Sequence, residues 1–480
     1  MLVETFTSEY GLFIDGTWSH ASDGRTIDVL DPALGERVAV VARATRVDLR
    51  RAVEAAKAGL AIWRNWRPED RGKALERAAS ILQERAENEA VSLTREAGKT
   101  FAESRAEFQR AVDALVWAGR AATDAYRRRD YPATGLDRFA LPEPIGVAAL
   151  FTPWNYPAVV VARKIGSALA AGCSAILKPS EETPGAAVAI VNAIADAGVP
   201  AGVVGLVFGD PAEVSTYFLA HPAISVLSFT GSTAVGKQLA RLAADTLKRC
   251  VLELGGHCPV IVCGDANVET AVAAIAAYKF ENAGQSCNAP SRIYVDATIY
   301  DLFVERFVEV TRRIVVGNGL EPATTMGPLS SARRIEAVVS LVSDAVAKGA
   351  KVALGGKRFE TSGYFYEPTI LLDVPQEATI MHEEPFGPVA PIFRCADLDE
   401  AIARSNDTPY GLASYVFSSC DATASYVADR FQAGSVGING LQGVAADAPV
   451  AGVGDSGYGY EGGMVGIDAF LNLKLVSKRT

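Results

Sequence analysis

Residues 146–178 read GVAALFTPWNYPAVVVARKIGSALAAGCSAILK. Two short apolar runs, VAALF (147–151) and SAILK (174–178), have the length and composition of buried strands. The segment between them, 157–172, is long and apolar enough to form a helix. A strand, a helix and a second strand in this order are typical of a βαβ unit, in which the two strands lie parallel.

The same alternation continues along the chain and then begins again. It predicts strands at 203–208 and 225–229 and helices at 184–198 and 211–220. Thr183 and Pro184 are typical of the cap and first turn of helix 184–198. A second series starts with the strand PVIVC (259–263), followed by a helix at 268–282 and the strand SRIYVD (291–296), and runs to about residue 435. We therefore expect an α/β fold with two open parallel-sheet domains, closely packed because no Pro/Gly/Ser-rich linker separates them.

The first part of the chain has a different character. Turn signals DGTW (15–18), SDGR (22–25) and DPALGE (31–36) predict short strands and hairpins. Residues 47–129 are rich in Ala, Glu, Arg and Leu with helical apolar spacing, which predicts several amphipathic helices.

Composition excludes several classes of function. The chain has 480 residues, of which 49% are hydrophobic and 21% charged, and its net charge is -10, so we expect no nucleic-acid partner. Arg163 and Lys164 interrupt the longest apolar segment, 157–177, and we expect no membrane insertion. The N-terminus is acidic where a signal peptide is basic. Seven cysteines without CxxC spacing predict free thiols, no metal site and a cytoplasmic location.

Two segments indicate a nucleotide site. FTGSTAVGK (229–237) places glycines between a strand and a helix with Val235, Leu239 and Leu242 on one face, so its first-turn N–H groups would hold a pyrophosphate. Because it is not GxGxxG, an ordinary tight turn into a helix is by itself the better explanation. In LKPSEETP (177–184), Lys178 and Glu181 stand at the carboxyl edge of the sheet and would bind a ribose, although an exposed loop pair is the simpler explanation. Glu181 would repel a 2′-phosphate and favour NAD over NADP.

Three further segments carry reactive groups. In FENAGQSCNAPSR (280–292), Cys287 lies in a turn, where a nucleophilic thiolate needs backbone donors and a cationic or nicotinamide neighbour that lowers its pKa. In LELGGHCP (252–259), Glu253 ends a strand, either as a desolvated general base with a raised pKa or as an ordinary ion-paired residue. In PWNYP (153–157), Asn155 either donates to an oxyanion or shapes a turn.

Taken in order, these segments closely resemble the aldehyde dehydrogenase superfamily. The resemblance rests on PWNYP, KPSE, FTGST, ELGG, GQSC, EEPFGP (383–388) and SGYG (456–459), and it extends through nearly the whole chain. It implies an NAD-binding domain (1–120 and 144–254), a catalytic domain (255–440) and a small β-rich oligomerisation arm (121–143 and 460–480). Homodimers or homotetramers are usual in this family.

The resemblance also assigns roles to individual residues. Cys287 is the nucleophile, Glu253 the base for hydrolysis, and Asn155 with the Cys287 N–H the oxyanion hole. NAD is the implied cofactor, with NADP not excluded, and the implied contacts are Thr152, Pro153, Trp154, Lys178, Ser180, Glu181, Phe229, Gly231, Ser232, Leu254, Glu384 and Phe386. The aldehyde would be lined by Tyr156, Val159, Val160, Arg163, Glu281, Ser286, Asn288, Val444 and Val450.

The substrate is less closely defined by the resemblance. The sequences of 162–173 and 456–463 are most similar to the succinate-semialdehyde dehydrogenase branch, and Arg163 matches one of its carboxylate-binding arginines. Its second arginine is replaced by Glu281, which would repel a dicarboxylic semialdehyde unless it pairs with Arg163. The usual PFGG is PVAG (449–452), which removes a phenyl ring. These departures favour a larger, aromatic or polar, aldehyde, with succinate semialdehyde as the alternative.

Two other functions remain open at the level of the residues. A non-catalytic relative would keep the scaffold as a structural or binding protein, but it would not need Cys287, Glu253 and Asn155. A thiol hydrolase would use Cys287 but would not need the KPSE and FTGST segments.

Overall fold

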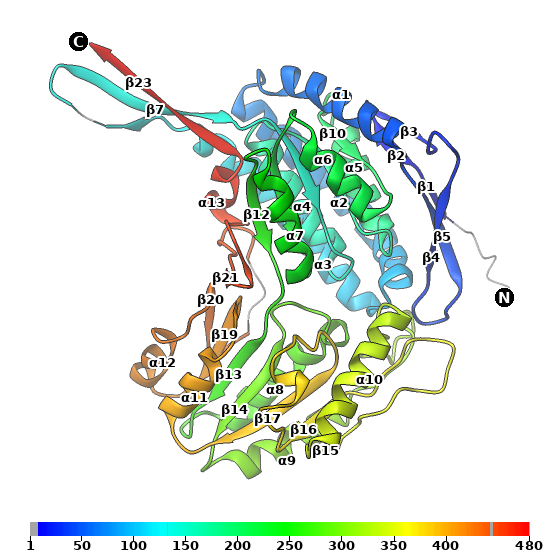
Figure 1. Cartoon of the computed structure of the whole chain (residues 1–480), viewed down its shortest axis with the longest axis vertical. Helices are drawn as coiled ribbons and strands as arrows, with labels where there is room; N and C mark the ends of the chain where they lie inside the picture. The colour runs from blue at the N-terminus through cyan, green and yellow to red at the C-terminus, as the bar shows by residue number, and fades with distance from the viewer. Residues whose placement is uncertain (1–7, 132, 442–444, 480) are drawn as a thin grey trace.

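The computed structural model describes residues 8–131, 133–441 and 445–479. Two large α/β units lie one above the other in Figure 1, and a narrow β arm that ends in the C-terminus projects from the upper one. None of the helices in these ranges combines the length and the apolar character needed to cross a membrane.

The upper unit is built on an eight-stranded sheet. Its order is β22-β12-β11-β8-β9-β10-β2-β3, with a parallel centre and antiparallel edges. The strands are β2 (Leu12–Ile14), β3 (Thr17–Ser19), β8 (Val147–Phe151), β9 (Ser174–Lys178), β10 (Val204–Leu206), β11 (Ile224–Thr230), β12 (Arg249–Glu253) and β22 (Gly457–Tyr458). The central strands β8 and β9 are completely buried, which explains why their sequences are continuous apolar runs.

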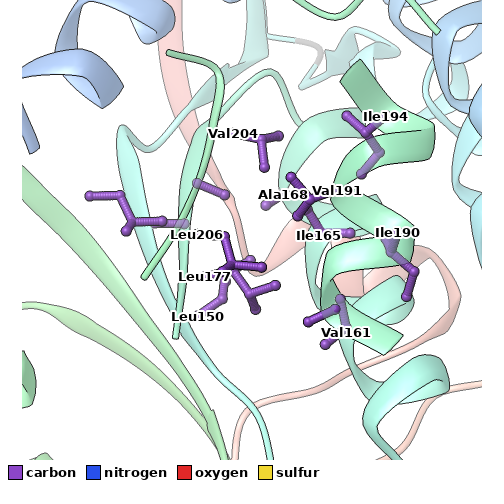
Figure 2. Packing of buried hydrophobic residues seen from close by; sticks show 14 of the residues in the cluster. Leu150, Val161, Ile165, Ala168, Leu177, Ile190, Val191, Ile194, Val204 and Leu206 are labelled. Atoms are coloured by element: carbon purple, nitrogen blue, oxygen red, sulfur yellow. The ribbon is translucent and has the colours of Figure 1, made fainter. Parts of the chain in front are cut away.

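Seven helices pack around this sheet: α1 (Arg46–Trp63), α2 (Pro68–Ala97), α3 (Phe101–Ala121), α4 (Pro157–Ala170), α5 (Pro184–Asp196), α6 (Pro211–Ala220) and α7 (Thr233–Ala244). Figure 2 shows the core between β8, β9 and β10 and the helices α4 and α5, where Leu150 and Leu177 face Ile165 and Ile190. These four side chains are completely inaccessible to solvent, as close packing of a sheet against helices requires.

The lower unit has a seven-stranded sheet of order β15-β16-β17-β14-β13-β19-β20, in which only β15 runs antiparallel to its neighbour. The strands are β13 (Cys258–Val262), β14 (Pro290–Asp296), β15 (Lys351–Leu354), β16 (Thr369–Leu372), β17 (Val389–Cys395), β19 (Ala413–Phe417) and β20 (Ser435–Ile438). Its helices are α8 (Val268–Phe280), α9 (Tyr300–Thr311), α10 (Ala332–Ala347), α11 (Leu398–Asn406) and α12 (Asp421–Ala428).

Three small sheets complete the fold. The arm is the sheet β23-β7-β6, formed by β6 (Arg129–Asp130), β7 (Leu136–Pro144) and β23 (Leu471–Arg479), and the helix α13 (Gly463–Asp468) leads into β23 (Figure 1). The others are β1-β5-β4, from β1 (Ser8–Tyr10), β4 (Thr26–Leu30) and β5 (Arg37–Ala42), and β18-β21, from β18 (Tyr410–Gly411) and β21 (Val453–Gly454). Short 3₁₀ helices occur at Asp124–Tyr126, Glu281–Gly284 and Thr379–Met381.

The predicted α/β fold with two parallel-sheet units is confirmed, with four local corrections. Turn 22–25 joins strands of two different sheets and forms no hairpin. The predicted strand at 203–208 is limited to Val204–Leu206. Val235 on α7 is 42% exposed and does not share the buried face of Leu239. Thr183 stands at the N-cap of α5 but makes no side-chain cap bond, because its hydroxyl donates to the Trp154 carbonyl 3.3 Å away.

Candidate active site

The loop that carries Cys287 has an unusual backbone. Helix α8 ends at Phe280, and the next turn holds Asn282 and Ala283 at φ values of 50° and 53°. Non-glycine residues rarely adopt this left-handed conformation, which costs energy and persists only where the surroundings hold it. Here Gln285 fixes the turn: its Nε2 donates to the Asn282 carbonyl at 3.0 Å, and its Oε1 accepts from the Ser330 N–H at 2.9 Å.

Asn155 is tied directly to this loop. Its Nδ2 donates to the Gln285 carbonyl at 3.0 Å, and its own carbonyl accepts from Asn282 Nδ2 at 3.1 Å. Asn155 follows strand β8 of the first sheet, whereas Gln285 precedes strand β14 of the second, so these bonds fasten the two α/β units together at the site. An amide nitrogen carries two hydrogens, and one of them remains for an oxyanion.

Glu253 is the last residue of β12 and is 6% exposed. Neither of its carboxylate oxygens has a hydrogen-bond partner among the described residues. Burial raises the pKa of Glu253, as expected from the sequence, and the positive charges of Lys164 and Arg163 oppose that rise. The carboxylate is therefore suited to accept a proton near neutral pH.

Two glycines connect Glu253 to the second unit. A Cβ at Gly256 would collide with the carbonyl oxygen of Cys287, so the chain passes directly against the Cys287 backbone. The Gly256 N–H donates to Glu384 Oε1 at 3.2 Å. The Glu253 strand end, Cys287 and Glu384 thus meet around one glycine turn.

The Cys287 thiol is half-buried, and its environment differs from the sequence-based expectation. Burial raises its pKa, and the neighbouring Glu384, Cys258 and Glu253 side chains raise it further, while its own backbone N–H acts in the opposite direction. In the protein without nucleotide, the expectation of a lowered Cys287 pKa is therefore wrong, because the sulfur is buried together with acidic side chains. All seven cysteines are free thiols, as predicted.

Glu384 and Phe386 close the site from the second unit. Burial raises the pKa of Glu384 to about 8. Phe386 has φ 42°, a strained conformation that Arg334 holds by donating to the Phe386 carbonyl at 2.9 Å. The Phe386 ring meets Trp154 edge-on, with centroids 5.5 Å apart, so two of the predicted cofactor residues contact each other across the two units.

Several of the remaining predicted cofactor residues carry polar groups that a dinucleotide could engage. Lys178 donates to Glu181 at 2.8 Å, and the second Glu181 oxygen accepts from the Gly209 N–H at 2.9 Å. Ser180 and Glu181 line a cavity of about 480 Å³. The Thr152 hydroxyl is buried without a hydrogen-bond partner among the described residues, and Ser232 does not cap the first turn of α7. An unpaired hydroxyl and an uncapped helix start are what a phosphate would satisfy. Pro153 and Trp154 are half-buried beside them, and Phe229 and Leu254 are buried beneath.

The predicted aldehyde-lining residues that the structure describes come from three segments. Tyr156, Val159, Val160 and Arg163 lie on the first turns of α4, and Glu281, Ser286 and Asn288 lie on the Cys287 loop. The Ser286 hydroxyl donates to Asn288 Oδ1 at 2.6 Å. Val450 pairs through its backbone with Glu461, whose carboxylate contacts Lys164 on α4. Val444 lies outside the described residues.

Sequence reasoning missed several charged groups on α3 and α4. Glu281 pairs with Arg110 of α3 at 3.4 Å, a residue that no motif had indicated. The Lys164 ammonium is buried and contacts Ser228 and Glu461, and burial lowers its pKa while the Glu253 charge opposes that shift. The sequence does contain one signal, because the charged residues at 103, 107 and 110 lie on one face of α3. An ordinary amphipathic helix buries an apolar face and exposes its charged one.

Glu107 of α3 forms a buried ion pair with Lys99, which lies next to Asn155. Lys99 Nζ lies 2.5 Å from Glu107 Oε2 and donates to the Asn155 carbonyl at 2.7 Å. The other Glu107 oxygen accepts from the N–H groups of Ala158 and Val159, at 2.8 and 3.3 Å. A carboxylate of α3 thus caps α4, which has no side-chain cap of its own, and this fixes the segment that carries Asn155.

Comparison with known proteins agrees with this geometry. The family model described as the aldehyde dehydrogenase family matches residues 18–476. The chain is 42% identical to 4-(hydroxymethyl)benzenesulfonate dehydrogenase of Comamonas testosteroni over 97% of each chain. It is 38% identical to the protein of Escherichia coli strain K12 named succinate-semialdehyde dehydrogenase (NADP(+)), over 96% of each chain. Its structure is similar to the crystal structure of succinate-semialdehyde dehydrogenase from Burkholderia pseudomallei, with a TM-score of 0.96, 38% identity and 98% of each chain covered.

Proposed function

Since this chain belongs to the aldehyde dehydrogenase family, we propose that it oxidises an aldehyde to the carboxylic acid with NAD, using Cys287 as nucleophile and Glu253 as base. The observation that carries the proposal is the meeting of Cys287, Asn155 and Glu253 from three separate segments of the chain. The bond from Asn155 Nδ2 to the Gln285 carbonyl and the contact of Gly256 with the Cys287 carbonyl hold this arrangement.

In the first step the Cys287 thiol gives its proton to the nearby Glu253 carboxylate, and the thiolate adds to the aldehyde carbonyl, which gives a thiohemiacetal alkoxide. The Asn155 amide and the Cys287 backbone N–H donate to that oxygen, and such donors stabilise charge far better in a water-poor site than in water. Bound NAD supplies the hydride acceptor. The resulting thioester is hydrolysed by a water molecule that Glu253 deprotonates. The raised pKa of Glu253 suits a group that takes up a proton and releases it again near pH 7.

The choice of NAD over NADP rests on Glu181. Both of its carboxylate oxygens are held, one by Lys178 and one by the Gly209 N–H, so the negative charge stays at the ribose position. A 2′-phosphate there would face a fixed carboxylate, and like charges at contact distance repel. Specificity for NADP, as in the E. coli relative, would require a different residue or a displaced Glu181.

For the substrate we propose a bulky aromatic aldehyde. The PVAG sequence leaves out a phenyl ring, and the Comamonas relative is named for a substituted benzene. Succinate semialdehyde is the second candidate, because Arg163 matches a carboxylate-binding position and the E. coli and Burkholderia relatives are named for that substrate.

Assembly and location belong to the same proposal. The arm sheet β23-β7-β6 exposes Leu473 and Leu475, 48% and 62% accessible, and a partner subunit in a homodimer or homotetramer would cover them. Seven free thiols are consistent with a cytoplasmic location. The division into an NAD-binding domain, a catalytic domain and an arm at the boundaries given above remains a prediction.

A panel of aldehydes assayed for NADH or NADPH formation tests the proposal, with Cys287→Ala as the control. We expect acid formation with NAD from benzaldehydes and none from the variant. If the native protein oxidises none of the aldehydes but still binds NAD in calorimetry, a non-catalytic relative would be favoured. Activity without any nucleotide, or turnover by Cys287→Ala, would overturn the assignment.

A further inference from the structure

One face of α3 points a row of charged side chains at the catalytic loops. Glu103 accepts from the Asn282 N–H at 2.8 Å, and Glu107 accepts from the first turn of α4. Arg110 comes one turn after Glu107 on the same face, since residues three and four apart on a helix are neighbours. The first two residues are engaged in holding the site together, which leaves the role of Arg110 to be explained.

Arg110 stands at the wall of the aldehyde site. Its NH2 group lies 3.4 Å from Glu281 Oε1, and the Tyr156 hydroxyl donates to the same oxygen at 3.4 Å. Its guanidinium carbon lies 5.5 Å from the centre of the Tyr156 ring. Tyr156 directly follows Asn155, and Glu281 lies on the loop that leads to Cys287, so the Arg110 head group is close to both catalytic segments.

The pairing of Arg110 is incomplete. A guanidinium has five N–H donors in a planar fork that matches a carboxylate or a sulfonate. The Arg110 Nε is buried and has no acceptor among the described residues, and the contact to Glu281 uses one terminal nitrogen at a long distance. A buried donor without a partner is costly, so it indicates a place where a ligand supplies the acceptor.

A second cation lies nearby. The positive charge of Arg110 is, after burial, the main influence that lowers the pKa of Arg163, to about 10, so the two guanidiniums act on each other and both remain charged at neutral pH. Glu281 pairs with Arg110, and the charge of Glu253 acts on Arg163. The two positive guanidiniums still repel each other, and an anion bound between them would reduce that repulsion.

We infer that Arg110 is a specificity-determining residue, which together with Arg163 binds an anionic group at the far end of the aldehyde while Glu281 orients its guanidinium. The inference rests on the proposed function and narrows it: the substrate is an aldehyde that carries a carboxylate or sulfonate remote from the carbonyl. Glu281 by its charge alone would repel an anionic substrate. In this arrangement Glu281 instead favours binding of the anion, because its carboxylate orients the Arg110 guanidinium that binds the anion.

Paired substrates that differ only in the anion test this role. We compare kcat/KM for 4-formylbenzenesulfonate with that for benzaldehyde, and for succinate semialdehyde with that for butanal. The native protein should prefer the charged member of at least one pair. Arg110→Met should reduce that preference about 10- to 100-fold, because a hydrogen bond to a charged group is lost. The loss should appear mainly in KM for the charged aldehyde, with kcat for the neutral one changed less than about threefold.

Three further measurements exclude a merely structural effect. Arg105→Met, on the same helix but in an exposed pair with Glu87, should leave the ratio unchanged. Arg110→Lys should recover part of the preference, since it restores the charge without the fork. Benzenesulfonate should inhibit the native protein competitively and inhibit Arg110→Met more weakly.

The outcomes separate the two proposals. If no aldehyde yields NADH or NADPH, the proposed function fails. If neutral aldehydes are oxidised and the native protein shows no preference for an anion, or Arg110→Met keeps the native preference, the role of Arg110 is refuted while the proposed function stands. If circular dichroism shows that Arg110→Met is unfolded, Arg110→Lys replaces it in the same comparison of charged and neutral aldehydes. A native ratio of kcat/KM values together with a native inhibition constant for benzenesulfonate in Arg110→Lys would refute the role of Arg110.

Discussion

Replacing Glu107 tests whether a buried ion pair on α3 positions Asn155. Lys99 and Glu107 are at most 2% exposed, and Glu107→Leu would leave the Lys99 ammonium buried, with the Asn155 carbonyl and the Tyr156 ring as its remaining partners among the described residues. Breaking a buried pair in this way costs about 3–5 kcal/mol of unfolding free energy. Loss of the two N–H acceptors at the start of α4 adds about 1 kcal/mol, the typical value of a helix cap.

The double variant Lys99→Met/Glu107→Leu distinguishes a charge effect from a packing effect. With both charges removed, the desolvation penalty disappears, and we expect a loss of only ~2 kcal/mol, for the cap and for the bond to Asn155. The double variant should therefore be more stable than Glu107→Leu alone. Activity should not recover, because the Asn155 carbonyl has lost one of its two donors and keeps only Asn282 among those described. We expect kcat to stay at least ~10-fold reduced, with the roughly 100- to 1,000-fold cost of losing an oxyanion donor as the upper limit.

Urea-induced unfolding followed by tryptophan fluorescence, together with steady-state kinetics, measures both effects. Arg85→Met is the matched control, since the Arg85–Asp196 pair, 2.7 Å apart, is largely exposed and should be worth less than ~1 kcal/mol. The reasoning is refuted if Glu107→Leu costs no more than the control, or if the cost in the double variant equals the sum of the two single ones.

Three more predictions concern the reacting groups. Glu253→Gln should release about one equivalent of NADH per site and then turn over ~100- to 10,000-fold more slowly, as stopped-flow absorbance would record. In the native protein, burial raises the pKa of Glu253, so thioester hydrolysis should become faster as the pH rises through values above the pKa of an ordinary carboxylate. A hydrolysis rate independent of pH from about 5 to 9 would contradict this. Glu384→Gln should shift alkylation of Cys287 by iodoacetamide to lower pH, since the Glu384 charge is, after burial, the largest cause of the raised thiol pKa; an unchanged pH profile would exclude that cause. Glu181→Ser should raise kcat/KM for NADP relative to NAD at least ~10-fold, measured with one aldehyde, whereas an unaltered ratio would show that its carboxylate does not determine nucleotide choice.

Local sequence determined the elements that carry the site. Strands β8 and β9 and helix α6 begin and end where their residues predicted, because a strand buried on both faces must be continuously apolar and a proline-led segment after an Asp cap must start a helix. The order of the motifs determined the family, which the match over residues 18–476 confirms. The roles of Cys287, Glu253 and Asn155 remain predictions, although the structure brings the segments that carry them together.

Tertiary structure decided the electrostatics around those groups. Arg110 and Glu281 are 171 residues apart in the chain, and Lys164 and Glu461 are 297 apart, so no local pattern pairs them. Threonine is a typical N-cap residue, but the Thr183 hydroxyl donates to the Trp154 carbonyl instead of capping the helix. Trp154 is close to Thr183 only in the folded chain. The thiol of Cys287 has a raised pKa for the same reason: a side chain's pKa depends on burial and on charges nearby in space, and both are set when distant segments pack together.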